Sequence, residues 1–416
     1  MNHDRFGTNF RTGGSRRAYH EPKQTCWPRL AFTGVGFSMS NRRTVFLACP
    51  YGQIGGGMGS IMTYLASMPS SPSNRFVFKR LESRGGGHIT LSPFFLGLAV
   101  GRIFLEAFRG RLAVVHVNLA ERGSIYRKAI LMAATKLVGG RVLLHLHAAQ
   151  IVQCYDSMRA PGRSLLGWMF RSADHCVVLG AFWQRWIIDT FGVRSNRIGI
   201  VYNGVPSTMR DARAARQGGQ FHLAFVGNLL ERKGVKDLLR AFAAPAIAAR
   251  DIRLTMAGGG PVETYRAMAA DLGIADRVTF TGWLGQTEAR ALIADADALI
   301  LPAYDEGLPL VILEALASRT PVICTPVGSI PEVLEHGSTA LFVTPGDEAG
   351  IAQAIATLVD RPDIRDGLSV AGAALYERLF TMEAFAKSID LLYVLLARRN
   401  GREGRSLSPP VQESRP

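Results

Sequence analysis

The sequence predicts an α/β protein made of two doubly wound domains with parallel sheets. Residues 297–331 show the pattern best. An apolar run of strand length, Ala298 to Pro302, ends in a polar turn, a helical run from Pro309 to Ala317 follows, and a second apolar run begins at Val322. Strand, loop, helix and strand in this order form a βαβ unit, which requires a parallel sheet. The 416 residues are enough for two such domains.

Composition places the chain among globular proteins, with 48% hydrophobic and 19% charged residues. Its five cysteines are scattered without a C-x-x-C pair, so we expect no disulfide framework, no zinc site and a cytoplasmic location. The nearest candidate for a spanning helix, Pro93 to Phe108, is interrupted by Arg102 and Glu106 and is shorter than the roughly 18 to 20 apolar residues required. No cleavable signal peptide opens the chain, so we expect a protein that is soluble or lies on a membrane.

Positive charge is concentrated in the first half of the chain. The net charge is +15, and residues 44–205 carry 18 Lys/Arg against 6 Asp/Glu, whereas residues 206–397 carry 17 against 23. A basic domain suits nucleic acid, anionic lipid or a phosphate-bearing substrate. No zinc-finger, RNA-recognition or basic-zipper pattern accompanies the charge, so we expect no nucleic-acid partner.

Composition also predicts the boundaries of the domains. Residues 1–43 are rich in Gly, Arg, Ser and Thr without periodicity and are interpreted as a flexible basic arm, although Met39 offers an alternative start. The other predicted segments are a first domain over 44–205, a linker and hinge over 206–220, a second domain over 221–383, a final helix over 384–397 and a disordered tail over 398–416.

The first domain offers several candidate ligand residues. The glycine-rich turn that contains Gly56 and Gly57 either cradles a phosphate or only connects a strand tightly to a helix. Ser124, Arg127 and Lys128 open a predicted helix, where they either hold a phosphate group or lie on a solvated face.

Two further features of the first domain are ambiguous. His145 and His147 share one side of the strand Arg141 to Leu146, and only the residue at its carboxyl end opens toward a ligand site. The stretch Leu91 to Leu112 contains apolar residues together with Arg102, Arg109 and Arg111. It is either an ordinary core helix or a basic amphipathic helix that rests on anionic lipid.

The second domain begins with the strand Phe221 to Val226 and the turn Gly227 to Gly234. Lys233 stands near the start of the next helix, where its ammonium either neutralises a phosphate or is solvated. The glycines at 258–260 are interpreted as a structural turn, because the dinucleotide pattern G-x-G-x-x-G is absent.

The turn Asp305 to Pro309 lies at the carboxyl end of its strand, where ligands bind in open parallel sheets. Gly307 lets the backbone approach a ligand, and the first amides of the following helix suit a phosphate. Glu306 and Glu314 are separated by seven residues. Two carboxylates at this spacing either hold two diols, one on each side of a diphosphate, or are solvated residues of a surface helix.

Residues 304–347 closely resemble the nucleotide-sugar site of family 4 retaining glycosyltransferases, which have the GT-B fold. The E-x7-E pair of that family is matched by Glu306 and Glu314, and its glycine turn and P-E-V/I helix are matched by Gly328, Pro331 and Glu332. The resemblance extends over about residues 44–396, and it implies that the two sheets face one another across a cleft. GT-B proteins also return their final helix to the first domain.

The resemblance implies roles for individual residues. Glu306 would hold the donor sugar, Glu314 the ribose, and Lys233 the diphosphate. The other donor-site residues it implies are Gly56 and Gly57 facing the donor phosphate, Trp283 at the nucleobase, Asn228 where the family usually has arginine, and the amides of Gly307, Leu308, Pro309 and Leu310 on the diphosphate. With His147 near the sugar, the implied catalytic residues are Glu306, Lys233 and His147.

The implied activity is transfer of a sugar, with retention, from a UDP- or GDP-sugar to a glycan or polyprenyl-linked acceptor in bacterial polysaccharide biosynthesis, at the inner face of the cell membrane. We expect no cofactor and no metal, because the D-x-D triplet of Asp295 and Asp297 precedes its strand and so lies at the wrong end of the sheet. The alternatives are a GT-B sugar-nucleotide epimerase and a nonenzymatic module that binds sugar nucleotides or polyanions.

Overall fold

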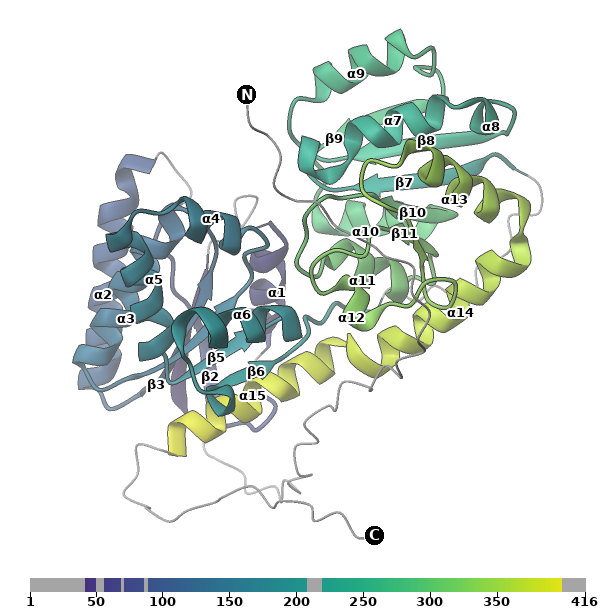
Figure 1. Ribbon diagram of the computed structural model, residues 1–416. Helices are drawn as coiled ribbons and strands as arrows, with labels where there is room; N and C mark the ends of the chain where they lie inside the picture. The colour runs from purple at the N-terminus through teal and green to yellow at the C-terminus, as the bar shows by residue number, and fades with distance from the viewer. Residues whose placement is uncertain (1–41, 50–55, 69–70, 86–88, 208–218, 399–416) are drawn as a thin grey trace. The chain divides into compact units, whose positions relative to one another are not determined.

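The computed structural model of the protein describes residues 42–49, 56–68, 71–85, 89–207 and 219–398. Within these residues the chain forms two parallel sheets of six strands, one from residues 43–200 and one from residues 221–342 (Figure 1). The α/β class with parallel sheets is therefore confirmed. The predicted basic arm, most of the linker and the tail lie outside the described residues.

The first sheet has the strand order β2-β1-β3-β4-β5-β6. All eight residues of β3 are buried, as is typical of a central strand covered by helices on both faces. Its strands are β1 (Arg43–Ala48), β2 (Phe76–Arg80), β3 (Leu112–Leu119), β4 (Arg141–Leu146), β5 (His175–Val178) and β6 (Ile198–Ile200). Its helices are α1 (Gly56–Ser67), α2 (Ser92–Phe108), α3 (Gly123–Leu137), α4 (Ile151–Ser157), α5 (Ala160–Ser172) and α6 (Ala181–Phe191), with 3₁₀ turns at Ile89–Leu91 and Ser195–Arg197.

The second sheet has the order β12-β11-β10-β7-β8-β9. Its strands are β7 (Phe221–Val226), β8 (Ile252–Ala257), β9 (Val278–Gly282), β10 (Ala298–Leu301), β11 (Val322–Cys324) and β12 (Leu341–Phe342). The helices that follow them are α7 (Val235–Ala243), α8 (Pro245–Ala248), α9 (Val262–Asp271), α10 (Gln286–Asp295), α11 (Leu310–Ala317), α12 (Ile330–Val333) and α13 (Glu348–Asp360), with a 3₁₀ turn, η5, at Glu231–Lys233.

Each sheet has one point where the strand order reverses. In the first sheet β1 and β3 are neighbours, with β2 on one side and β4 to β6 on the other. In the second sheet β7 and β10 are neighbours, and the chain continues outward from them in opposite directions. Because the connecting loops diverge at such a point, a crevice opens at the carboxyl ends of these two strands.

Two long helices end the described chain, α14 (Pro362–Leu379) and α15 (Met382–Arg398), drawn in yellow in Figure 1. α14 packs on α11 of the second sheet, whereas Phe385 and Ile389 of α15 share a buried cluster with Val45 and Leu47 of β1. α15 therefore completes the core on one face of the first sheet.

Further contacts join residues of the two halves. Glu332 of α12 accepts hydrogen bonds from the amides of Ala181 (2.6 Å) and Phe182 (2.9 Å), the first residues of α6. The amide of Val205 donates to the carbonyl oxygen of Phe380 at 2.9 Å, where α14 gives way to α15. The strand β6 ends at Ile200, and Val205 forms an isolated bridge to Thr381.

None of the helices within the described ranges is both long and apolar enough to cross a bilayer.

Candidate functional site

Two turns meet at the switch point of the second sheet. After β10, the amide of Tyr304 donates to the carbonyl oxygen of Arg232 (2.8 Å), and the Arg232 guanidinium donates to the carbonyl oxygen of Asp305 (3.0 Å). Gly234 has a φ of +70°, and a Cβ placed there would lie 2.1 Å from the carbonyl oxygen of Pro302. Only glycine permits this approach, which fixes the turn after β7 against the loop after β10.

This packing brings Lys233 and Glu306 together. Their side chains, 13% and 9% exposed, form an ion pair and hydrogen bond between Nζ and Oε1. Burial lowers the pKa of Lys233 to about 7; the neighbouring Arg232 lowers it further, and Asp305 opposes the shift. Both residues were predicted as ligand contacts, but their pairing was not, because no local pattern relates positions 73 residues apart.

The loop that carries Glu306 is held in place from β11. Gly328 has a φ of +59°, and a Cβ there would lie 1.9 Å from the carbonyl oxygen of Glu306. The amide of Ser329 donates to the carbonyl oxygen of Gly307 at 2.9 Å. Pro309 caps α11 in an extended conformation, so the helix begins at Leu310 with its amino end toward the loop. Gly307, Leu308 and Pro309 are buried.

Glu314 lies one turn further along α11 and is 8% exposed. Burial raises its pKa to about 7, and the positive charge of Arg290 in α10 opposes that shift. The Arg290 guanidinium also lies 5.7 Å from the ring of Tyr64 in α1. Arg290 and Tyr64 are therefore site neighbours that the sequence reasoning missed; neither lies in a recognisable motif.

Two other predicted donor residues lie on turns at the same end of the sheet. Asn228 follows β7 and is exposed, and Trp283 follows β9 and is 51% exposed. Gly258 packs tightly between them, since a Cβ there would lie 1.9 Å from the carbonyl oxygen of Gly227. The glycines at 258–260 therefore make a structural turn, as predicted.

The predicted histidine lies beyond the carboxyl end of β4. Its Nε2 is 2.9 Å from Oδ1 of Asn118, and a hydrogen bond joins the two side chains. Burial lowers the pKa of His147 to about 3, which keeps it neutral. The ring of His145 lies beside it, tilted by 36° with centroids 3.9 Å apart, while Nδ1 of His145 contacts Nε2 of His116 at 3.2 Å.

Cationic side chains gather at the switch point of the first sheet. Lys128 of α3 is only 2% exposed and donates to the carbonyl oxygen of Ala48, at the end of β1. It therefore does not lie on a solvated helix face. Arg127 and Arg84 have buried Nε atoms with no hydrogen-bond partner among the described residues, and burial and Arg84 lower the pKa of Arg127. Ser124 instead accepts a long hydrogen bond from the amide of Ala120 (3.4 Å). Gly56 and Gly57 are the first residues of α1.

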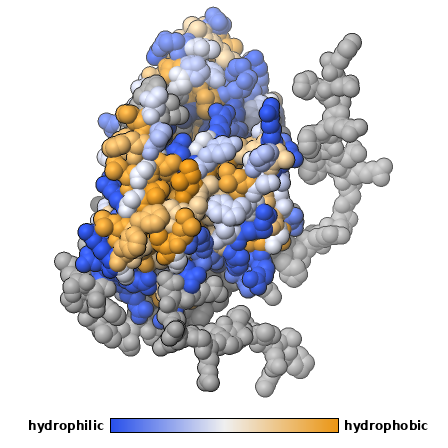
Figure 2. All heavy atoms as spheres, turned by 90° about the vertical axis from the view of Figure 1, so that its left-hand side faces the viewer, coloured by the Kyte–Doolittle hydropathy of each residue, from blue (hydrophilic) through white to orange (hydrophobic). Residues whose placement is uncertain are grey.

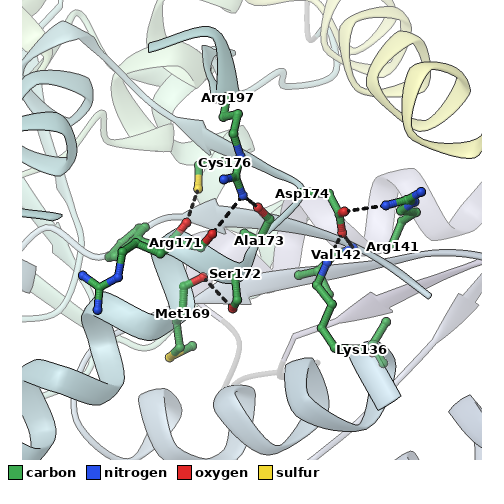
Figure 3. Close-up of polar contacts among 12 residues, drawn as sticks. Lys136, Arg141, Val142, Met169, Arg171, Ser172, Ala173, Asp174, Cys176 and Arg197 are labelled. Carbon is green, nitrogen blue, oxygen red and sulfur yellow. Dashed lines mark hydrogen bonds and ion pairs between the residues drawn. The ribbon is translucent and has the colours of Figure 1, made fainter. Parts of the chain in front are cut away.

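A different polar cluster lies at the amino ends of the strands (Figure 3). Asp174 accepts from Arg141 (2.9 Å), from the amide of Val142 (2.8 Å) and from Lys136. Burial alone would raise its pKa, but these contacts lower it overall. A neighbouring cavity of about 270 Å³ is lined by Asp174, His175, Arg194, Asn196 and Arg197. This end of a parallel sheet is not where its ligands bind, so we assign the cluster a structural role.

Asp297 of the D-x-D triplet lies at the same end of the second sheet, where it accepts from the amide of His222 at 2.7 Å. Among the described residues, no group of three or more His, Cys, Asp or Glu side chains is arranged to hold a metal ion.

Comparison with known proteins connects this geometry to a family. Residues 220–361 match the family model described as "Glycosyl transferases group 1". The chain is 30% identical over 251 residues to the glycogen synthase of Mycobacterium tuberculosis, an alignment that covers 60% of each protein. It is 34% identical over 200 residues to the D-inositol 3-phosphate glycosyltransferase of Corynebacterium diphtheriae, which covers 45% of this chain and 47% of that enzyme. The chain thus spans about three-fifths or less of the length of these relatives.

The fold is shared more widely than the sequence. Sucrose-phosphate synthase from Thermosynechococcus elongatus aligns with a TM-score of 0.67 at 20% identity, covering 85% of this chain and 99% of that one. The Anabaena protein HepE in complex with UDP-glucose aligns with a TM-score of 0.67 at 16% identity, covering 85% and 99%. The β7 to α13 region, with Lys233 and Glu306 at its switch point, lies within the match to the group 1 glycosyltransferase model, and the chain shares the GT-B fold of these two structures.

Proposed function

We propose that the protein is a retaining glycosyltransferase that moves a sugar from a nucleoside diphosphate sugar to a glycan or lipid-linked acceptor. The observation that carries this proposal is the buried pair of Lys233 and Glu306, placed at the switch point beside the amino end of α11. A cation, backbone amides and an acid in this arrangement suit a diphosphate that is attached to a hydroxyl-rich sugar.

Donor binding replaces contacts that the protein makes with itself. Lys233 turns from Glu306 to the diphosphate, which also meets the amides of residues 307–310, while Glu306 accepts hydrogen bonds from the sugar hydroxyls. Glu314 accepts from the ribose, and Trp283 lies against the base. Each buried charge thereby keeps a partner, which matters because an unpaired buried charge is costly. HepE has been solved with UDP and with UDP-glucose, which supports a nucleotide sugar as the donor. We propose UDP or GDP as its nucleotide.

Transfer with retention needs little covalent chemistry from the protein. The bond between the anomeric carbon and the diphosphate oxygen breaks, and the acceptor oxygen bonds to that carbon on the same face of the sugar. The proton of the acceptor hydroxyl passes to the departing diphosphate oxygen. Lys233 and the loop amides stabilise the negative charge that develops there, and His147 forms a hydrogen bond with a sugar hydroxyl. The reaction as proposed needs no metal, so a chelator should leave its rate unchanged.

The acceptor carries phosphate. Lys128, Arg127 and Arg84 supply positive charge at the switch point of the first sheet, and two of them have buried nitrogens that lack a described partner. Such a cluster suits a phosphate or diphosphate group. A polyprenyl diphosphate-linked glycan of bacterial polysaccharide biosynthesis, at the inner face of the membrane, fits this chemistry.

Activity of two point variants tests the proposal. Lys233→Ala and Glu306→Ala should each lower the rate of sugar transfer, or the rate of slow donor hydrolysis, about a hundredfold. This corresponds to a loss of about 2.7 kcal/mol of transition-state stabilisation, without unfolding of the protein. Lys236→Ala removes an exposed lysine three residues away and serves as the matched control. Undiminished turnover in the two site variants would refute these roles.

The same assay separates the alternatives. An epimerase releases an altered free sugar nucleotide without any acceptor, and a nonenzymatic binding module shows neither transfer nor hydrolysis.

A further inference from the structure

Helices α2 and α3 present apolar side chains to solvent. Along α2 the exposed residues include Phe94 (64%), Leu98 (48%), Leu105 (47%) and Phe108 (85%), at spacings of three, four and seven residues that place them on one side of the helix. The opposite side of α2 is buried through Ala99 and Ile103. An α-helix that is apolar on both sides normally has both sides covered, so the outer side is expected to meet another apolar phase.

The neighbouring helix repeats the pattern. α3 packs beside α2 and exposes Tyr126 (55%), Ile130 (48%) and Leu137 (81%), again at helical spacing. Together with Leu91, these side chains are eight of the fifteen large hydrophobic residues that are exposed in the described part of the chain. We name the seven helical residues the α2–α3 face. Figure 2 shows this side of the molecule as a broad apolar area bordered by hydrophilic residues.

The charges around the face are mostly positive. Residues 89–141 carry eight Lys/Arg and two Asp/Glu. One of the acids, Glu106, turns inward, where it accepts from Thr44 (2.7 Å) and Lys79 (2.8 Å). Arg102 and Arg111 are exposed beside the apolar residues. An apolar surface with a predominantly cationic border is complementary to an anionic lipid bilayer, in which acyl chains lie beneath negative headgroups.

We infer that the α2–α3 face docks the protein on the surface of an anionic phospholipid membrane. The contact is peripheral, with Phe94 and Phe108 entering the headgroup region and the arginines pairing with lipid phosphates. The biological role of this docking rests on the proposed function, since docking would bring a lipid-linked acceptor to the amino ends of α2 and α3, the region of Arg84 and Arg127. The docking itself requires neither donor nor catalysis.

Vesicle sedimentation with the full chain tests this inference. The probes are vesicles of phosphatidylcholine alone or with about a third phosphatidylglycerol. The protein should sediment with the anionic vesicles, more weakly at high salt, and only weakly with the neutral ones. Phe94→Ser combined with Phe108→Ser should weaken the binding at least about tenfold, and Arg102→Glu should weaken it severalfold.

Matched controls lie on α14. Val370→Ser removes an apolar side chain that is 64% exposed, and Arg378→Glu reverses an exposed charge, so both should bind vesicles as the unchanged protein does. Thermal unfolding shows that each variant is folded. The inference is overturned if the unchanged protein ignores anionic vesicles, or if the face variants bind as well as the controls. It is also overturned if the face variants split a dimer in light scattering while vesicle binding persists, because the face would then be a contact between two copies.

A thermal shift with UDP and GDP, measured on the same samples, keeps the two proposals apart. Binding of vesicles without any nucleotide response counts against the proposed function alone. A nucleotide response without vesicle binding counts against the membrane contact alone.

Discussion

The ion pair of Lys233 and Glu306 shows what single residues contribute to this site. Both are nearly buried, and desolvation of two charges offsets much of their attraction, so a pair of this kind is weak evidence of stabilisation. In the absence of ligand, the two side chains bind each other through the groups that would contact the donor. The ligand-binding positions of Glu306, Glu314 and Lys233 could be predicted from the spacing of the two acids and from the place of the lysine before a helix. The positions of Arg290, Tyr64 and Arg84 could not, because only the folded chain brings these side chains close to the predicted ligand residues.

The pKa of Lys233 predicts a pH dependence of nucleotide binding. Because burial lowers this pKa to about 7, the ammonium is present below pH 7 and is lost as the pH rises above it. Affinity for a nucleoside diphosphate should therefore fall between pH 7 and pH 9, by up to about tenfold per unit. Calorimetric titration measures this affinity at each pH. Lys233→Arg, which stays charged, should make the affinity nearly independent of pH. A flat profile in the unchanged protein contradicts this assignment.

Glu314 predicts a pH dependence of stability in the absence of ligand. Its pKa is raised to about 7 in the folded protein, so the folded state holds a proton that the unfolded state releases near its ordinary pKa. Stability is therefore lost as the pH rises through this interval, and the loss is complete above pH 7. Glu314→Gln should be more stable than the unchanged protein by about 2 kcal/mol at pH 8 and by little at pH 5.

Chemical denaturation at the two pH values checks this, with Glu335→Gln, an exposed glutamate, as the control. An equal gain at both pH values would show that burial of the Glu314 charge is not its cause.

At the scale of elements, the site depends on turns that hold one another. The unit from Ala298 through α11 to β11 could be predicted, since apolar strand, glycine turn and helix follow each other directly in the sequence. Helix α14 was missed because Gly367 and Gly372 weaken its helical signal. Whether the outer side of α2 is covered or exposed was left open by the sequence. Apolar periodicity alone cannot say whether a helix is covered on both sides, and only the fold shows α2 to be half exposed.

Gly328 tests the packing of these turns. Gly328→Ala should destabilise the protein by about 1 to 3 kcal/mol and weaken nucleotide binding, because its Cβ would displace the Glu306 carbonyl. Gly337→Ala is the control, since Gly337 has a similar φ of +76° but open space around it. Equal effects of the two changes, measured by denaturation and titration, would assign the cost to backbone conformation alone.

At the scale of the whole molecule, the chain crosses between its two sheets twice, near residue 205 and again between α14 and α15. The returning helix α15 was expected from the resemblance, but its polar contacts were not: Tyr393 lies 2.7 Å from Nδ1 of His116, and Asp390 accepts from the amide of Ser73 (2.9 Å). These contacts join residues about 280 to 320 positions apart. No pattern within one segment of sequence could reveal them.

Because α15 completes the core of the first sheet, a change in this helix should affect the whole molecule. Ile389 is fully buried against that sheet, so Ile389→Ala should lower the free energy of unfolding by about 2 to 5 kcal/mol. Lys387→Ala, on the exposed side of the same helix, should change it little. Denaturant unfolding compares the two, and similar stabilities would mean that the first sheet does not depend on α15.

The most direct test of the central claim compares affinities for a sugar nucleotide and for its nucleoside diphosphate, using the pair that gives the largest thermal shift. If Lys233 holds the diphosphate and Glu306 the sugar, Lys233→Ala weakens binding of both ligands, whereas Glu306→Ala weakens only the sugar nucleotide. Equal losses for both ligands in Glu306→Ala, or no loss in Lys233→Ala, would contradict the account.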